Sequence, residues 1–239
     1  QILADPFLVK WFAQNGDLSH PKVKAVPIGL NCFEHAPEMH QTLQLLRAKS
    51  PYGASSGSET RPNLVFVNFG NTHASRKVVW EHFCGKAAKE ARFATCSVKS
   101  QQNNVRGNPH LVSYYKKMSS FKFVVAPRGN GWDTHRLWEA LYLGCVPIVE
   151  TSPLDELYRG LPVLIVKNWK TLTEAKLAEE YQRLKPTGPG GFHETPLLHR
   201  AHYRSLLEAT RTEALEKLKG TQALDTPGAL NATRFRCWG

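Results

Sequence analysis

Polar side chains suited to phosphate binding gather in APRGNGWDTHRLWEALYLGCVPIV, residues 126–149. Arg128 and Arg136 carry guanidinium groups, which neutralise phosphates through charge-assisted and often bidentate hydrogen bonds. Glu139 follows Arg136 by three residues, so in a helix the two side chains share one face. A carboxylate there can accept hydrogen bonds from the two hydroxyls of a ribose. These residue types at this spacing predict a site for a nucleoside diphosphate.

The loop Arg128-Gly129-Asn130-Gly131 joins an apolar segment to this helix. Its glycines permit a positive φ and allow backbone N–H groups to approach a ligand closely. We expect Asp133 to cap the helix, with Thr134 or His135 opening it. The free N–H groups and partial positive charge of a helix start suit a phosphate. A plain surface helix with an Arg–Glu pair is the alternative, and the loop glycines and second arginine favour the ligand site.

Apolar segments alternate with amphipathic ones over residues 63–170. The pattern predicts strands, separated mostly by helices, at residues 63–69, 93–98, 121–127, 146–150 and 163–166. Such alternation indicates an α/β fold with a doubly wound parallel sheet. Ligands of these sheets bind outside the carboxyl ends of the strands. The loop 128–131 follows strand 121–127 at that end, where a binding site is expected.

The chain is basic, because 31 Lys and Arg residues outnumber 20 Asp and Glu residues and give a formal net charge of +11. Such a surface attracts polyanions such as acidic glycans, nucleic acid or phosphorylated metabolites, although a merely soluble basic domain has the same balance. The basic residues form no long block, so we expect no nucleic-acid partner. No apolar run reaches the ~20 residues of a membrane helix, so any membrane anchor would lie outside this chain.

Five cysteines are present, and none belongs to a CxxC pair. Cys145 lies in an apolar run and is expected in the core. The other four are compatible with one or two disulfides, and their spacing selects no pairing: Cys32, Cys84, Cys96 and Cys237. The sequon that begins at Asn231 fits glycosylation in a secretory compartment. We therefore expect the Golgi or another secretory lumen, with the cytoplasm as the alternative.

Residues 127–149, PRGNGWDTHRLWEALYLGCVPIV, resemble the donor-site segment of exostosin-like glycosyltransferases, which have the GT-B fold. The shared features are PRG, an arginine, a Glu-Ala-Leu helix, and Gly-Cys-x-Pro before a strand. The resemblance implies that Glu139 holds the ribose of a nucleotide sugar. Thr134-His135-Arg136 is also similar to the Thr-Glu-Lys donor motif of some fucosyltransferases. Weaker resemblance covers about residues 20–170, including HPKVKAVPIGL and NFGNTHASRK.

The resemblance implies a donor site built from two strand-to-helix junctions. Its expected members are Asn71, Thr72, Arg76, Arg128, Gly129, Asn130, Asp133, Thr134, His135, Arg136 and Glu139. Contacts that select the base are expected near residues 97–100 or Tyr114–Tyr115. The implied organisation is an N-terminal segment at 1–47, a linker or loop at 48–62, a donor-binding domain at 63–184, and C-terminal helices and a tail at 185–239.

The implied activity is transfer of a sugar from a nucleotide-diphosphate sugar to a hydroxyl of a glycan or glycoconjugate, with inversion. A UDP-sugar is favoured and a GDP-sugar is the alternative. No cofactor or metal is expected, since an Asp-x-Asp motif is absent. Gly131 stands where many retaining GT-B enzymes have a glutamate, so their mechanism is not transferred. Only residues 1–27 precede the donor-type unit, which implies an acceptor half in a missing domain or a partner chain.

The resemblance does not identify the catalytic base, for which Asp17, His20 and His73 are candidates. The alternative function is a non-catalytic module that keeps the donor-type fold and binds an acidic glycan or another protein. The presence of Arg128, Arg136 and Glu139 together favours the enzyme.

Overall fold

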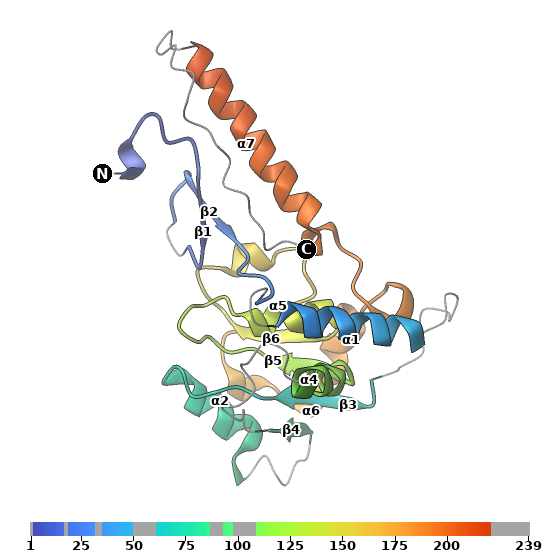
Figure 1. Cartoon of the computed structure of the whole chain (residues 1–239). Helices are drawn as coiled ribbons and strands as arrows, with labels where there is room; N and C mark the ends of the chain where they lie inside the picture. Colours follow the sequence, from blue (N-terminus) through green and yellow to red (C-terminus); the bar gives the residue numbers. More distant parts are fainter. Residues whose placement is uncertain are drawn as a thin grey trace.

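A parallel sheet of five strands forms the centre of the computed structural model, which describes residues 2–16, 19–31, 35–49, 61–86, 93–97 and 109–220 (Figure 1). The strands are β3 (Asn63–Val67), β4 (Ala94–Cys96), β5 (Phe121–Val125), β6 (Val146–Glu150) and β7 (Leu164–Val166). Neighbouring strands all pair in parallel, in the order β4-β3-β5-β6-β7. The predicted α/β fold with a parallel sheet is therefore confirmed, and the sheet is Rossmann-like.

Helices cover both faces of this sheet. One face carries α2 (Ser75–Cys84) and α6 (Glu174–Leu184), and the other carries α1 (Ala36–Lys49), α4 (Pro109–Ser119) and α5 (His135–Tyr142). In β3, Val65 and Val67 pack on the first face and Phe66 on the second, because successive strand side chains point to opposite faces. Since both faces are buried, the strands are almost continuously apolar.

The strand order creates a topological switch point between β3 and β5. β3 comes first in the chain but lies between β4 and β5, so the chain proceeds to one side of β3 and then to the other. Loops that leave β3 and β5 at their carboxyl ends diverge, and ligands of such sheets bind between them. The loop after β3 begins at Asn68 and the loop after β5 at Ala126, which places the predicted site at this switch point.

A glycine, Gly144, lies at the C-terminal end of α5. Gly144 has a φ of +76°, and the N–H groups of Gly144 and Cys145 donate to the carbonyls of Leu141 (3.0 Å) and Ala140 (2.9 Å). This left-handed conformation favours a residue without a Cβ. A Cβ at Gly144 would also collide with the carbonyl oxygen of Gly191. The glycine therefore ends the helix and lets the C-terminal segment pass close behind it.

Two side chains hold that C-terminal segment against the end of α5. Arg61 is buried and donates from Nη2 to the carbonyls of Leu143 (2.7 Å) and Gly191 (2.9 Å). His193 donates from Nε2 to the carbonyl of Cys145 at 3.0 Å. Burial, only partly opposed by this hydrogen bond, lowers the pKa of His193 from 6.5 to about 4. His193 is therefore neutral in the folded protein at pH 6.

His193 should make the fold sensitive to acid. Between its unfolded pKa of 6.5 and its folded pKa of about 4, the unfolded chain binds a proton that the folded chain does not. Stability is consequently lost as the pH falls through this window, by up to about 1.4 kcal/mol per pH unit. We expect the stability advantage of the wild type over His193→Gln, measured by urea unfolding, to shrink from pH 7 to pH 5. An advantage that does not change with pH would contradict this assignment.

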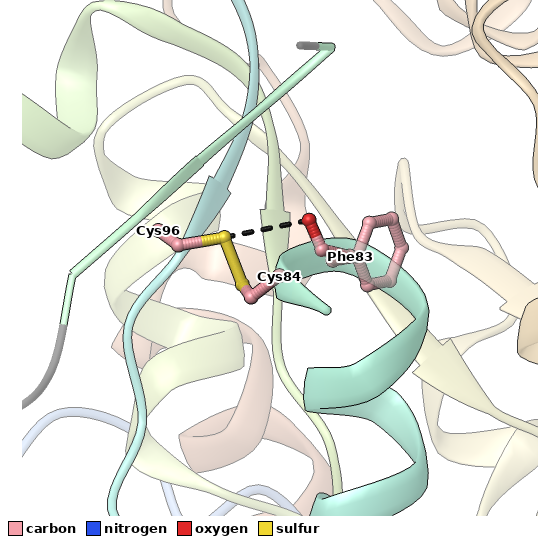
Figure 2. Close-up of a disulfide and its surroundings, with 3 residues drawn as sticks. All are labelled: Phe83, Cys84 and Cys96. Carbon is pink, nitrogen blue, oxygen red and sulfur yellow. Dashed lines mark hydrogen bonds between the residues drawn. A yellow bond between two sulfur atoms is a disulfide. The ribbon is translucent and has the colours of Figure 1, made fainter. Parts of the chain in front are cut away.

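A disulfide joins Cys84, the last residue of α2, to Cys96, the last residue of β4 (Figure 2). The Cys96 sulfur also lies 3.4 Å from the carbonyl oxygen of Phe83. Strand β4 has three residues and pairs only with β3 within the described part of the chain, so few backbone hydrogen bonds hold it in the sheet. The disulfide adds a covalent link between this strand and α2. Cys145 is free and buried, which confirms its predicted place in the core.

The N-terminal part and the last described helix expose large apolar side chains. β1 (Trp11–Gln14) and β2 (Val23–Val26) form a separate parallel pair, and α7 (Arg200–Gly220) extends away from the main sheet (Figure 1). The exposed apolar residues of these parts are Ile2, Phe7, Trp11, Leu207, Leu215 and Leu218. A two-stranded sheet is marginal by itself, and exposed apolar surface is compatible with contact to a further protein surface. The acceptor half or partner chain stays a prediction.

The other described elements are short 3-10 helices: η1 (Ile2–Ala4), η3 (Asp155–Tyr158), η4 (Trp169–Thr171), η5 (Pro189–Gly191) and η6 (Pro196–Leu198). Helix α1 packs against the main sheet, where Met39 belongs to the same apolar cluster as α4. Residues 50–60 of the predicted linker lie outside the described part of the chain, as do Cys32 and the tail with Asn231 and Cys237. Within the described ranges, no helix has the combined length and apolarity that crossing a membrane requires.

Candidate functional site

The Arg76 side chain forms hydrogen bonds to both loops that follow β3 and β5. Its guanidinium donates from Nη1 to the carbonyl of Gly70 (2.7 Å), from Nε to that of Arg128 (2.7 Å) and from Nη2 to that of Pro127 (3.1 Å). Burial and the nearby charge of Arg136 lower the pKa of Arg76 to about 10, so it stays charged at neutral pH. Arg76, predicted as a ligand contact, thus positions the backbone of both loops.

Close packing explains the glycine at position 129. Neither Gly129 nor Gly131 has a positive φ, so the left-handed conformation that glycine permits is not used at either position. A Cβ on Gly129 would instead lie 2.9 Å from Arg76 Nη2 and 3.2 Å from Thr72 Oγ1. The missing Cβ therefore lets the loop after β3 approach the loop after β5.

The carboxylate of Asp133 points into the protein. Asp133 is 2% exposed and accepts hydrogen bonds from Trp138 Nε1 (2.9 Å), Ile28 N (2.7 Å) and Tyr158 OH (3.3 Å). Thr134 occupies the N-cap position of α5, and no described side chain caps that helix. The capping role predicted for Asp133 is therefore wrong, because buried donors hold its carboxylate inside. Burial raises the pKa of Asp133 to about 6.

His135 also holds the segment that follows β2. Its Nδ1 donates to the carbonyl of Gly29 at 2.7 Å. Asp133 and His135, both predicted as ligand contacts, thus anchor residues 28–29 to the start of α5. The first turn of α5 has no side-chain cap, so its partial positive charge remains available to an anion.

Arg136 reaches from α5 to the end of β3. Its Nη1 lies 3.4 Å from Asn68 Oδ1, and its guanidinium carbon lies 5.5 Å from the centre of the Tyr114 ring. Its Nε lies 3.8 Å from Glu139 Oε2. Arg136 and Glu139 therefore share one face of the helix, and the guanidinium bridges the two sides of the switch point.

Glu139 is a buried and ionised carboxylate. It is 5% exposed, its Oε1 accepts a hydrogen bond from Tyr115 OH at 3.0 Å, and the same oxygen lies 3.8 Å from His35 Nδ1. Burial acts to raise the pKa of Glu139, but hydrogen bonding from His35 and the charge of Arg136 outweigh burial and lower the pKa below 4.5. At neutral pH the carboxylate can accept hydrogen bonds from a sugar diol.

The sequence analysis did not identify two residues of this site, Asn68 and His35. Asn68 directly follows β3, and the rule that ligands bind at strand ends could have identified it. His35 precedes α1 and is distant in the chain from Glu139, so no local spacing connects them. Tyr114 and Tyr115, considered for base recognition, contact Arg136 and Glu139, while residues 98–100 lie outside the described ranges.

Three buried polar atoms of this segment have no hydrogen-bond partner in the described structure: Arg128 Nε, Thr134 Oγ1 and Arg136 Nε. Further such atoms lie elsewhere in the described fold, among them Arg61 Nε and Trp169 Nε1. Native proteins leave few such atoms unsatisfied, because each costs about 1–3 kcal/mol. The Arg128 guanidinium lies over the Trp132 ring, 3.8 Å from its centre, which restricts where the group can point. A ligand rich in acceptor oxygens would satisfy both guanidinium groups.

The remaining predicted residues lie on the exposed parts of the two loops. Asn71 and Thr72 follow β3, Asn130 follows β5, and all three are exposed. The fold thus brings residues from both predicted junctions to the switch point. Their contacts with a ligand remain a prediction.

The chain is similar to a protein of Arabidopsis thaliana described as a "probable glycosyltransferase", with 28% identity over 145 residues. The matched region covers 59% of this chain and 24% of the length of that protein. No protein-family model matches the chain. The similarity supports a glycosyltransferase in general terms.

Proposed function

We propose that the chain binds a nucleotide-diphosphate sugar and forms the donor-binding part of an exostosin-like glycosyltransferase with the GT-B fold. The similarity to the Arabidopsis protein supports the general class. The observation that carries the proposal is the group of buried, unsatisfied atoms of Arg128, Thr134 and Arg136 at the switch point. A diphosphate supplies acceptor oxygens for these atoms and for the other N–H groups of the two guanidinium groups, and Glu139 accepts hydrogen bonds from the ribose.

Transfer proceeds with inversion in this proposal. The acceptor hydroxyl loses its proton to a base and attacks the anomeric carbon, while the bond from that carbon to the diphosphate oxygen breaks. The negative charge that develops on the diphosphate is stabilised by Arg128, Arg136 and the N-terminus of α5. The two guanidinium groups supply the positive charge, so the mechanism requires no metal. UDP is the favoured nucleotide and GDP the alternative.

We assign no catalytic base among the three candidates. His20 Nδ1 accepts from Lys22 N at 3.1 Å, and His73 Nδ1 accepts from Ser75 N at 3.2 Å. These hydrogen bonds engage Nδ1 of each ring in a local backbone contact. Asp17 lies outside the described residues. The proposal places the base in the acceptor half, in a further domain or a partner chain.

The disulfide supports a secretory compartment for this enzyme. Structural disulfides persist in oxidising environments such as the lumen of the secretory pathway. The Cys84–Cys96 bond joins two elements of the main sheet unit and is therefore part of the fold. We propose that the chain acts on glycans or glycoproteins in the Golgi or a neighbouring compartment.

Nucleotide binding tests the proposal directly. Calorimetric titration with UDP, GDP and CMP should show a nucleoside diphosphate binding with a Kd in the micromolar-to-millimolar range typical of enzyme substrates. CMP is the matched control, because it lacks the diphosphate. If neither UDP nor GDP binds and an acidic glycan such as heparin does, the result favours the alternative function, a non-catalytic binding module.

Glu139→Gln should weaken binding of the nucleoside diphosphate by about 10- to 150-fold, because a hydrogen bond to a charged group contributes about 1.5–3 kcal/mol. Binding of inorganic pyrophosphate should change less, because pyrophosphate has no ribose. Titration of both ligands into the wild type and the variant measures the contrast. An equal loss for both ligands, or a lower Tm with unchanged affinity, would assign Glu139 to a structural role beside Arg136.

A further inference from the structure

Asn15 has a backbone conformation that other residues rarely adopt. Its φ is 52°, and no other non-glycine residue in the described ranges has a positive φ. Asn15 directly follows β1, at the carboxyl end of the two-stranded sheet. Asparagine tolerates the left-handed region better than most residues. Such conformations persist where surrounding contacts hold them, and they cluster at functional sites.

The Asn15 side chain pairs with the loop that follows β5. Asp133 N donates to Asn15 Oδ1 at 2.6 Å, and Asn15 Nδ2 donates to the Asp133 carbonyl at 3.4 Å. One amide group therefore engages both backbone polar groups of a residue that lies 118 positions later. These contacts hold the backbone immediately before Thr134, the N-cap of α5.

Gly131 makes room for the Asn15 side chain. A Cβ on Gly131 would lie 2.5 Å from Cγ and Oδ1 of Asn15 and 2.6 Å from its Nδ2. The φ of Gly131 is not positive, so its backbone conformation does not itself require glycine. The approach of Asn15 therefore explains this glycine of the loop.

We propose that Asn15 is a positioning residue for the donor site. By pairing with Asp133 it holds the loop 129–133 in the conformation in which Arg128 and the first turn of α5 bind the diphosphate. This inference rests on the proposed function and extends it, because it makes the N-terminal segment part of the donor site. Asp133 and His135 also contact residues 28–29, so the N-terminal segment holds both the backbone and the side chain of Asp133.

Asn15→Gly and Gly131→Ala test the contact from its two sides. Glycine at position 15 keeps the left-handed backbone accessible and removes the amide, whereas alanine at position 131 displaces it. Each variant should raise the Kd for UDP, or for GDP if the wild type prefers it, by about 5- to 10-fold, because losing one or two hydrogen bonds lowers the population of the binding conformation of the loop. In the double variant the two effects should not add, because they remove the same interaction.

Asn168→Gly is the matched control. Like Asn15, Asn168 accepts a hydrogen bond from a backbone N–H through its Oδ1, here from Lys170 N at 2.9 Å, but it is exposed. The Asn168→Gly variant should bind the nucleotide with the affinity of the wild type. If the wild type binds and the variants at 15 and 131 bind equally well, this inference is overturned while the proposed function stands. Additive losses in the double variant also overturn it. If the wild type binds neither UDP nor GDP, the proposed function fails and the inference fails with it.

Discussion

Replacing Arg136 by alanine is expected to weaken binding of the nucleoside diphosphate by about 10- to 150-fold. The proposed guanidinium–diphosphate hydrogen bond is charge-assisted, and losing such a bond costs about 1.5–3 kcal/mol. The stability should also fall, because Arg136 is the cation beside the buried Glu139 carboxylate, so the affinity is measured at a temperature at which the variant is folded. Titration calorimetry with UDP and GDP measures the affinity, and scanning calorimetry measures the stability.

Arg183→Ala is the matched control for this prediction. Arg183 on α6 pairs with Glu180 at the same i,i+3 spacing as Arg136 with Glu139, but the Arg183 side chain is largely exposed. Exposed ion pairs contribute little, so neither nucleotide affinity nor stability should change by more than about 0.5 kcal/mol. If Arg136→Ala lowers the Tm and leaves nucleotide affinity unchanged, Arg136 belongs to a structural ion pair and the donor-site proposal fails.

Removing the disulfide by joint Cys84→Ala and Cys96→Ala replacement is expected to lower the free energy of unfolding by about 3 kcal/mol. The two cysteines are separated by 12 positions, and the chain-entropy model predicts about this value for a loop of that size. In a chain of this length, the loss corresponds to a decrease in Tm of roughly 6–12 °C. Scanning calorimetry of the wild type and the double variant measures it.

Dithiothreitol provides the control for the disulfide. Reduction should lower the Tm of the wild type toward that of the double variant, because both then lack the covalent constraint on the unfolded chain. The double variant should respond much less, and Cys145 contributes nothing because it is already a free thiol. Equal Tm values for the oxidised wild type and the double variant would show that the bond does not constrain the unfolded chain.

Local sequence determined the strands and the fold class. The segments 121–127 and 146–150 are apolar on both faces, and they contain β5 and β6, whose two faces are covered by helices. Gly144 ends α5 because the left-handed backbone conformation at this position favours a residue without a Cβ. Each of these features depends on residues that are close together in the chain, so their pattern can be read before the fold is known.

The position of the candidate site also followed from the sequence, whereas the orientation of its side chains did not. Polar residues after a parallel strand lie at the edge of the sheet where ligands bind. Asp133 is chemically suited to cap α5, yet Ile28, Trp138 and Tyr158 supply donors that hold its carboxylate inside. Helix propensity does not reveal such donors, because they come from three separate parts of the fold.

Only the tertiary structure decided which distant segments meet. The pairing of Cys84 with Cys96 depends on α2 ending beside β4, and the hydrogen bonds from Arg76 to both loops depend on β3 and β5 being neighbours. Gly131 is explained by Asn15, a residue on the other side of the sequence-predicted linker. These contacts depend on the strand order and on how the helices pack, and both are decided by burial of the whole core. The spacing of residues within one segment therefore cannot predict which distant segments meet.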